Sequence, residues 1–291
     1  MKIIYHLGLH CTDERRLERN LRRNTGLLAK HGIVIPDPDV YKPMLKNVVN
    51  AMHGAPSSQE TEETVLDSVM VADEAERIVF LNESFLCVRP RVLSQGALYA
   101  MAPEKVMALV NLLPSHEAEI AFAIRNLATF LPALFQSTKG DSFDDFLSGV
   151  NIHELSWASM VGRIRAALSD LPMTIWCDED TPLIWPEVMH AVSGAPADLR
   201  LKGQDDVLAS ILAKEGMDRL SAYLADHPEF ESHHRHRAIM AFLDKYALPD
   251  QVEMEIDLPG WDEALVEQLS ANYDSDLNEI AEMPGVTLIE P

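Results

Sequence analysis

The first 35 residues carry the pattern that most constrains the fold of this chain. Residues 2–6 (KIIYH) are a short apolar run, which is typical of a strand buried in a parallel sheet. A turn follows, and a helix is expected from Thr12 or Asp13, both good N-cap residues, to Gly32. Residues 33–35 (IVI) predict a second short strand. This order of elements is the opening of a βαβ unit.

The alternation of strands and helices continues along the chain. Further strands are expected at residues 77–81, 118–124, 172–176 and 286–289, the last being either a strand or a docked tail. Helices are expected at residues 103–112, 127–137, 142–148, 155–169, 182–193, 205–225, 234–246 and 261–282. This alternation predicts a three-layer α/β fold, in which helices cover both faces of a mostly parallel sheet.

The domain organisation follows from length and composition. With 291 residues, of which 47% are hydrophobic, the chain has enough apolar surface for one large α/β domain spanning residues 1–291. Residues 37–75 are polar and predict an insertion of one or two helices with a flexible link near residues 54–56. Residues 205–291 are expected to form a C-terminal helical portion packed on the core.

The net charge of the chain limits the classes of partner that it can bind. The chain has 46 Asp and Glu against 24 Lys and Arg, a formal net charge of −22. Such a surface repels nucleic acid and anionic membranes, because both bind proteins through Lys and Arg. No apolar run is long enough for a membrane span, and the N-terminus lacks the apolar segment of a signal peptide. The remaining candidates for a partner are therefore a small-molecule acceptor and another protein.

The cysteines indicate the compartment. Cys11, Cys87 and Cys177 are odd in number and far apart, and no CxxC pair occurs. A disulfide framework and a structural zinc site are therefore not expected, and a reducing cytoplasm fits best. Two other clusters are candidates for metal sites, the histidine-rich segment 231–237 and the acids at 178–180. We interpret the first as a solvated helix start and the second as a cap of the next helix, so no metal is expected.

The turn after the first strand is the most informative segment. Residues 5–15 connect the end of the first strand to the start of the first helix. In parallel α/β sheets, ligands bind at the carboxyl ends of the strands. A helix N-terminus at this position favours anions. An ordinary capped turn would equally explain Gly8, Thr12 and Asp13, so both interpretations stand.

This segment resembles the start of the bacterial sulfotransferase family, which reads His-x-Gly-x-His-Lys-Thr-Gly-Thr-Thr. The matching residues are His6, Gly8, His10 and Thr12, followed by residues 31–33 with Pro36, 80–85, 123–126 with Phe130, 142–147, 273–274, 284–286 and Ile289. The resemblance spans most of the chain in order. It implies the sulfotransferase-like fold of the P-loop type and a sulfuryl donor, phosphoadenosine phosphosulfate (PAPS), whose product is adenosine 3′,5′-bisphosphate (PAP).

The resemblance also assigns roles to residues. Gly8 and Thr12 belong to the donor loop, and Arg125 corresponds to the arginine that holds the 3′-phosphate. Ser137 lies one turn beyond the position of the family's serine, which is Ala133 here. Arg15 or Arg16 could stand in for the loop lysine, and His10 or Glu83 could act as the base that deprotonates an acceptor hydroxyl. A structural role is the alternative for both, which for His10 means a ring bonded to the backbone. A salt bridge to one of the many acids is the alternative role of Arg125.

The loop departs from the family pattern at four positions. Cys11 replaces the lysine, Asp13 replaces the glycine, and Glu14 and Arg15 replace the two threonines. A phosphate cradle needs backbone N–H groups, a cation and small side chains, whereas this loop gains two acids. The sequence therefore predicts a degenerate phosphosulfate-binding loop whose carboxylates satisfy the helix N-terminus. A divergent, non-catalytic relative is expected, and an active sulfotransferase acting on a hydroxyl or amine is the alternative.

Overall fold

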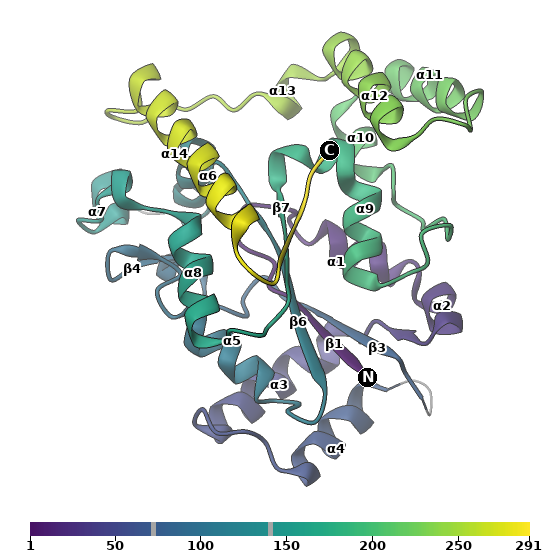
Figure 1. The fold of residues 1–291 in the computed structure, drawn as a ribbon. Coiled ribbons are helices and arrows are strands. Elements are labelled where there is room, and N and C mark those ends of the chain that lie inside the picture. Colours follow the sequence, from purple (N-terminus) through teal and green to yellow (C-terminus); the bar gives the residue numbers. More distant parts are fainter. Residues whose placement is uncertain (71–73, 139–141) are drawn as a thin grey trace.

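A six-stranded parallel sheet forms the middle of the molecule in the computed structural model, which describes residues 1–70, 74–138 and 142–291 (Figure 1). The strand order is β2-β3-β1-β6-β7-β8, and every neighbouring pair is parallel. The strands are β1 (Lys2–His6), β2 (Ile33–Val34), β3 (Arg77–Leu81), β6 (Glu117–Ile124), β7 (Met173–Cys177) and β8 (Val286–Ile289). The predicted strands are confirmed to within about a residue, and residues 286–289 are a strand rather than a tail.

Helices cover both faces of the sheet, which confirms a three-layer α/β architecture. One face carries α3 (Pro38–Met52), α4 (Gln59–Val69), α5 (Ala102–Val110), α6 (Leu127–Thr138), α8 (Trp157–Ala167) and α14 (Glu263–Glu282). The opposite face carries α1 (Arg16–Arg22), α2 (Thr25–Leu28), α9 (Thr181–Ser193) and α10 (Asp206–Ile211). Helix α7 (Phe143–Leu147) packs against the core of the first face, and α13 (Pro249–Val252) contacts α10.

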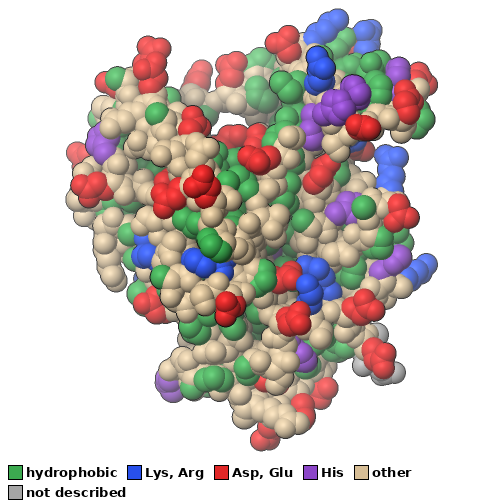
Figure 2. Space-filling view, viewed as in Figure 1, with side chains coloured by type: hydrophobic (Ala, Val, Ile, Leu, Met, Phe, Trp, Pro, Cys, Tyr) green, Lys and Arg blue, Asp and Glu red, His purple; other side chains and the backbone are tan. Residues whose placement is uncertain are grey.

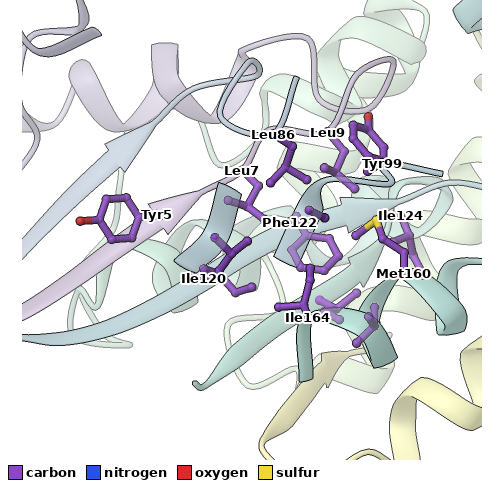
Figure 3. Packing of buried hydrophobic residues seen from close by; sticks show 14 of the residues in the cluster. Tyr5, Leu7, Leu9, Leu86, Tyr99, Ile120, Phe122, Ile124, Met160 and Ile164 are labelled. Atoms are coloured by element: carbon purple, nitrogen blue, oxygen red, sulfur yellow. The ribbon is translucent and has the colours of Figure 1, made fainter. Parts of the chain in front are cut away.

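The first face holds the larger core, part of which is drawn in Figure 3. Phe122 lies in the middle of this core, near Ile120 of the same strand and Ile164 of α8. At the end near the loops, Leu9 and Tyr99 lie together, and both are almost completely buried. Apolar packing therefore extends past the strand ends into the segments that follow them, and this fixes those segments in place.

The segments expected as attachments are parts of this architecture. Helices α3 and α4 contribute Tyr41, Leu45, Val65 and Val69 to the main core. The C-terminal portion is divided. Helix α14 and β8 belong to the sheet layers, whereas α11 (Lys214–Ala225) and α12 (Ser232–Tyr246) pack with α10 around a small separate cluster.

Two expected helices are interrupted. The helix expected to begin at Thr12 or Asp13 begins at Arg16, and it breaks at Asn24, whose buried side chain bonds both backbone groups of Lys202. The helix expected over 205–225 breaks before α11, because Leu212 pairs with Ala247 and Ala213 donates to the carbonyl of Tyr246, at the end of α12. In both places a tertiary contact replaces helical hydrogen bonds.

A small hairpin was not expected from the sequence. Strands β4 (Leu93–Ser94) and β5 (Ala97–Leu98) are antiparallel and are joined by Gln95 and Gly96, which both have positive φ. Two left-handed residues in succession suit a tight hairpin turn. This hairpin leads directly to Tyr99, so it positions one of the buried residues beside the loop after β1.

Candidate functional site

A pocket of about 550 Å³ opens at the carboxyl edge of the sheet, beside the loop that follows β1. Its walls are formed by that loop, by the segment after β3, by Arg125 at the end of β6 and by α6. The described residues that line it are Gly8, Leu9, Cys11, Asp13, Glu14, Arg15, Glu83, Arg89, Arg125, Ala133, Gln136 and Ser137. We call it the loop pocket.

Gly8 lets the loop approach the neighbouring segment. Its φ is +53°, and a Cβ at this position would lie 3.0 Å from the backbone N and Cα of Glu83. A side chain would therefore meet both an unfavourable backbone conformation and a main-chain clash. Gly8 thus brings the segment carrying Glu83 against the loop.

The acidic residue Asp13 occupies the start of the first helix. Its carboxylate accepts hydrogen bonds from the backbone N–H of Leu17 at 2.9 Å and of Arg15 at 3.3 Å. The prediction that a loop carboxylate satisfies this helix start is confirmed for Asp13. For Glu14 the described residues show no such bond of the carboxylate; only its main-chain carbonyl accepts a hydrogen bond, from Arg19.

Thr12 is turned away from the loop pocket. Its hydroxyl donates to the carbonyl of Leu9 at 2.6 Å, an interaction that closes the turn. Arg16 likewise lies outside the set of described residues that line the pocket. Of the residues expected to bind a donor, the structure brings together Gly8, Arg15, Arg125 and Ser137 (the last beside Cys11, with Oγ and Sγ 3.9 Å apart).

Arg125 contacts the loop directly. Its Nη1 donates to the carbonyl oxygen of Cys11 at 2.8 Å, and its Nε donates to the hydroxyl of Thr129 at 3.0 Å. Among the residues that the structure describes, no carboxylate lies within ion-pair distance of this guanidinium. Within the described residues, Arg125 therefore does not form the salt bridge that was the alternative to phosphate binding.

The other two arginines of the loop pocket face carboxylates. Arg15 pairs with the buried Glu18 at 2.6 Å, and Arg89 lies 3.6 Å from Glu83. Arg89 was missed at the sequence level, because the segment after β3 carries no helical or strand pattern that would show where its side chain points. Three arginines and the three acids Asp13, Glu14 and Glu83 line the pocket, so their formal charges cancel.

The two expected bases differ in accessibility. His10 is 2% exposed and its Nδ1 lies 3.1 Å from the hydroxyl of Tyr99, so it belongs to the core rather than to the pocket wall. Burial, reinforced by the charge of Arg89, lowers its pKa to about 4. Glu83, in contrast, lines the pocket. The structure therefore favours the structural alternative for His10 over a role as base, and it leaves Glu83 as the candidate base that a ligand could reach.

Asp178 is a further acid at this edge of the sheet. It follows β7 directly, and burial raises its pKa to about 7, with Arg125 opposing the shift and Glu179 and Asp13 adding to it. The acids at 178–180 do not cap α9 with their side chains. Glu179 instead accepts from the backbone N–H of Asn126 at 2.8 Å and from the Tyr273 hydroxyl at 3.2 Å, which ties α14 to the ends of β6 and β7.

No protein-family model, curated protein or solved structure matches this chain.

Neither a metal cluster nor a membrane helix is present in the described ranges. In residues 1–70, 74–138 and 142–291, no three His, Cys, Asp or Glu side chains converge as metal ligands. No helix in the same ranges is long and apolar enough to cross a bilayer. Acidic side chains are spread over the whole face shown in Figure 2, and the basic ones gather at a few places.

Proposed function

We propose that this chain is a divergent, non-catalytic relative of the bacterial sulfotransferases, whose scaffold persists as a binding or regulatory protein. The proposal rests on the ordered sequence resemblance together with one feature of the loop. The N–H groups of Arg15 and Leu17 point at the carboxylate of Asp13, where a phosphate-binding loop would keep such groups for its ligand. A phosphosulfate would have to displace this carboxylate.

Electrostatics adds to this steric argument. Two like charges 4 Å apart repel by about 4 kcal/mol at an effective dielectric constant near 20. Asp13, Glu14 and Glu83 balance the three arginines that line the loop pocket, so the pocket offers no net positive charge to a polyanionic donor. The position of the family's lysine is held by the Cys11 thiol. Burial raises the pKa of this thiol, so it is neutral at physiological pH and supplies no positive charge. We infer that PAPS is not a ligand of this loop.

Titration with PAP by calorimetry tests the proposal. We expect no heat of binding at millimolar nucleotide. Micromolar binding that disappears in Arg125→Ala would contradict the proposal, because it would place the nucleotide in the loop pocket. Arg200→Ala, which changes an exposed arginine far along the chain from the loop, is the matched control for nonspecific charge effects.

An active sulfotransferase is the second candidate, and the state of Arg125 favours it. A guanidinium without a carboxylate partner among the described residues, in a pocket that Ser137 also lines, suits an anionic group. In this reaction the acceptor oxygen bonds to the sulfur of PAPS, the bond from sulfur to the phosphate oxygen breaks, and PAP leaves. Glu83 would take the acceptor proton. Transfer of labelled sulfate from PAPS that is lost in Glu83→Gln would support this candidate.

A further inference from the structure

A second and larger pocket lies on the other side of the segment after β3. It has a volume of about 730 Å³, within the range of about 300–1,000 Å³ that is usual for small-molecule sites. Glu83 faces the loop pocket, whereas its neighbours Asn82 and Ser84 line this one. The two pockets share none of their described lining residues. We call the larger one the α3–α5 pocket.

Helices α3 and α5 and the segment 82–101 that precedes α5 form its walls. Helix α3 supplies Leu45 and Val49, and helix α5 supplies Ala102 and Leu109, at spacings that bring each pair to one side of its helix. Figure 1 shows α3 and α5 near each other. Tyr99, the residue whose hydroxyl contacts His10, closes the pocket toward the core. The lining is mainly apolar, so the pocket suits a hydrophobic body.

Large apolar side chains are also left in solvent at this pocket. Val88 is 55% exposed and Met101 is 44% exposed, and both are lining residues. A few exposed apolar residues are normal on any surface, but these two belong to one concave site. An apolar ligand would cover them and gain the free energy of removing their surface from water.

Four cations surround this apolar lining. Lys42 and Lys46 come from α3, Arg91 comes from the segment after β3, and Lys105 comes from α5. Among the described residues none of the lining side chains is acidic, although acids outnumber bases by 46 to 24 in the chain. The positive charge is therefore concentrated at this pocket against the overall composition.

Most of this positive charge is not neutralised within the protein. Lys42 pairs with Glu18 at 2.9 Å, but Lys46, Arg91 and Lys105 form no ion pair in the part of the chain that the structure describes. Cations beside an apolar surface attract a ligand that has an anionic end and a hydrophobic body. A neutral or cationic apolar molecule would leave this charge without a partner.

We propose that the α3–α5 pocket binds a free medium-chain carboxylate, with the hydrocarbon chain between α3 and α5 and the carboxylate at the lysines and Arg91. This inference does not depend on the function proposed for the loop pocket, because the two sites are built from different residues.

Calorimetry with decanoate and its neutral analogue decan-1-ol tests the chemistry of the ligand. We expect decanoate to bind with a dissociation constant about tenfold or more below that of decan-1-ol, because only the acid meets the cations. Shortening the acid to octanoate should weaken binding by about three- to fourfold for each methylene removed. Equal affinity for the acid and the alcohol, or no binding of either at millimolar concentration, would overturn the proposal.

Variants test the location. Lys46→Gln/Lys105→Gln should weaken decanoate about tenfold or more and leave decan-1-ol unchanged. Lys30→Gln/Lys214→Gln, which changes two exposed lysines that do not line the pocket, is the matched control and should bind decanoate like the unmodified protein. An equal loss in both double variants would reject specific recognition by this pocket. Thermal unfolding of each variant verifies that it is folded.

A free thiol provides an independent readout. Cys87 lines the α3–α5 pocket, so decanoate should slow its alkylation, measured by peptide mass spectrometry. Alkylation of Cys11, in the loop pocket, is the internal control and should be unaffected. Protection of Cys11 instead of Cys87 would assign the ligand to the loop pocket and contradict the proposal. Vesicles of phosphatidylglycerol present negative charge on a membrane surface and are the control for the source of the anion. They should not protect Cys87 if the ligand is a free carboxylate. Protection by the vesicles would overturn that assignment.

Discussion

The carboxylate of Asp13 accepts a 2.9 Å hydrogen bond from the backbone N–H of Leu17, at the start of α1. In the family that the sequence resembles, a glycine occupies the position of Asp13 and leaves this region to the donor's phosphates. In this chain the Asp13 carboxylate accepts the backbone hydrogen bond that a bound anion would otherwise accept. The same carboxylate both stabilises the turn and lowers the affinity of the loop pocket for a second negative group.

Removal of this carboxylate separates the two effects. Asp13→Ala should lower the free energy of unfolding by about 1 kcal/mol, the usual cost of losing a helix cap, and Asp13→Asn should recover most of it. Urea unfolding monitored by circular dichroism measures both values. Inorganic phosphate should raise the stability of Asp13→Ala more than that of the unmodified protein. If Asp13→Ala is as stable as the unmodified protein, the carboxylate does not support the turn.

Restoring the family loop should restore nucleotide affinity. The variant Cys11→Lys/Asp13→Gly/Glu14→Thr/Arg15→Thr brings back the lysine and the small side chains and removes both acids. We expect it to bind PAP with micromolar affinity in calorimetry, because Arg125 already lies at the loop. Adding Arg125→Ala to this variant should abolish the binding. A folded loop variant that still fails to bind PAP would contradict the inferred relationship to the sulfotransferases.

Gly8→Ala tests the close approach between the loop and Glu83. We expect a loss of about 1–3 kcal/mol in the free energy of unfolding, since the new Cβ combines positive φ with a main-chain clash. Gly54→Ala is the matched control, because Gly54 has φ +86° but a Cβ added there would have no neighbouring atom within 4 Å. The two variants should differ by the cost of the clash alone. Equal losses in both would exclude the close approach as a constraint.

Asp178→Asn should stabilise the protein in a pH-dependent way. Because the folded-state pKa is about 7 and the ordinary value is about 3.9, the folded protein binds the extra proton between these limits. The contribution of this group to stability therefore falls as the pH rises from about 4 to about 7. The variant should gain about 1–3 kcal/mol at pH values above about 7 and little at pH 4.

Urea unfolding across this pH range measures the difference. The exposed Asp198→Asn variant removes one charge from the same acidic chain and is the control for general repulsion. A gain at neutral pH that is the same size in both variants would mean that overall charge, and not the burial of Asp178, is responsible.

Much of the fold could be predicted from the sequence, because its signals are local. The strands β1, β3 and β8 begin and end where the apolar runs do, and most helices follow the 3.6-residue spacing within a few residues. Asp13 could be recognised in the same way as a carboxylate at the helix start, although α1 begins only at Arg16. The breaks at Asn24 and before α11 could not, because each depends on a partner that lies far away in the chain, Lys202 for the first and the chain after α12 for the second.

For the functional sites, the sequence by itself determined which chemical groups lie in the loop after β1, among them a thiol and two acids. Only the tertiary structure decided which groups meet them. It put Arg89 and Arg125 beside the loop, buried His10 against Tyr99, and gathered Lys46, Arg91 and Lys105 around one apolar pocket. These side chains come from separate elements, so their proximity arises from the packing of helices on the sheet, which no local pattern specifies.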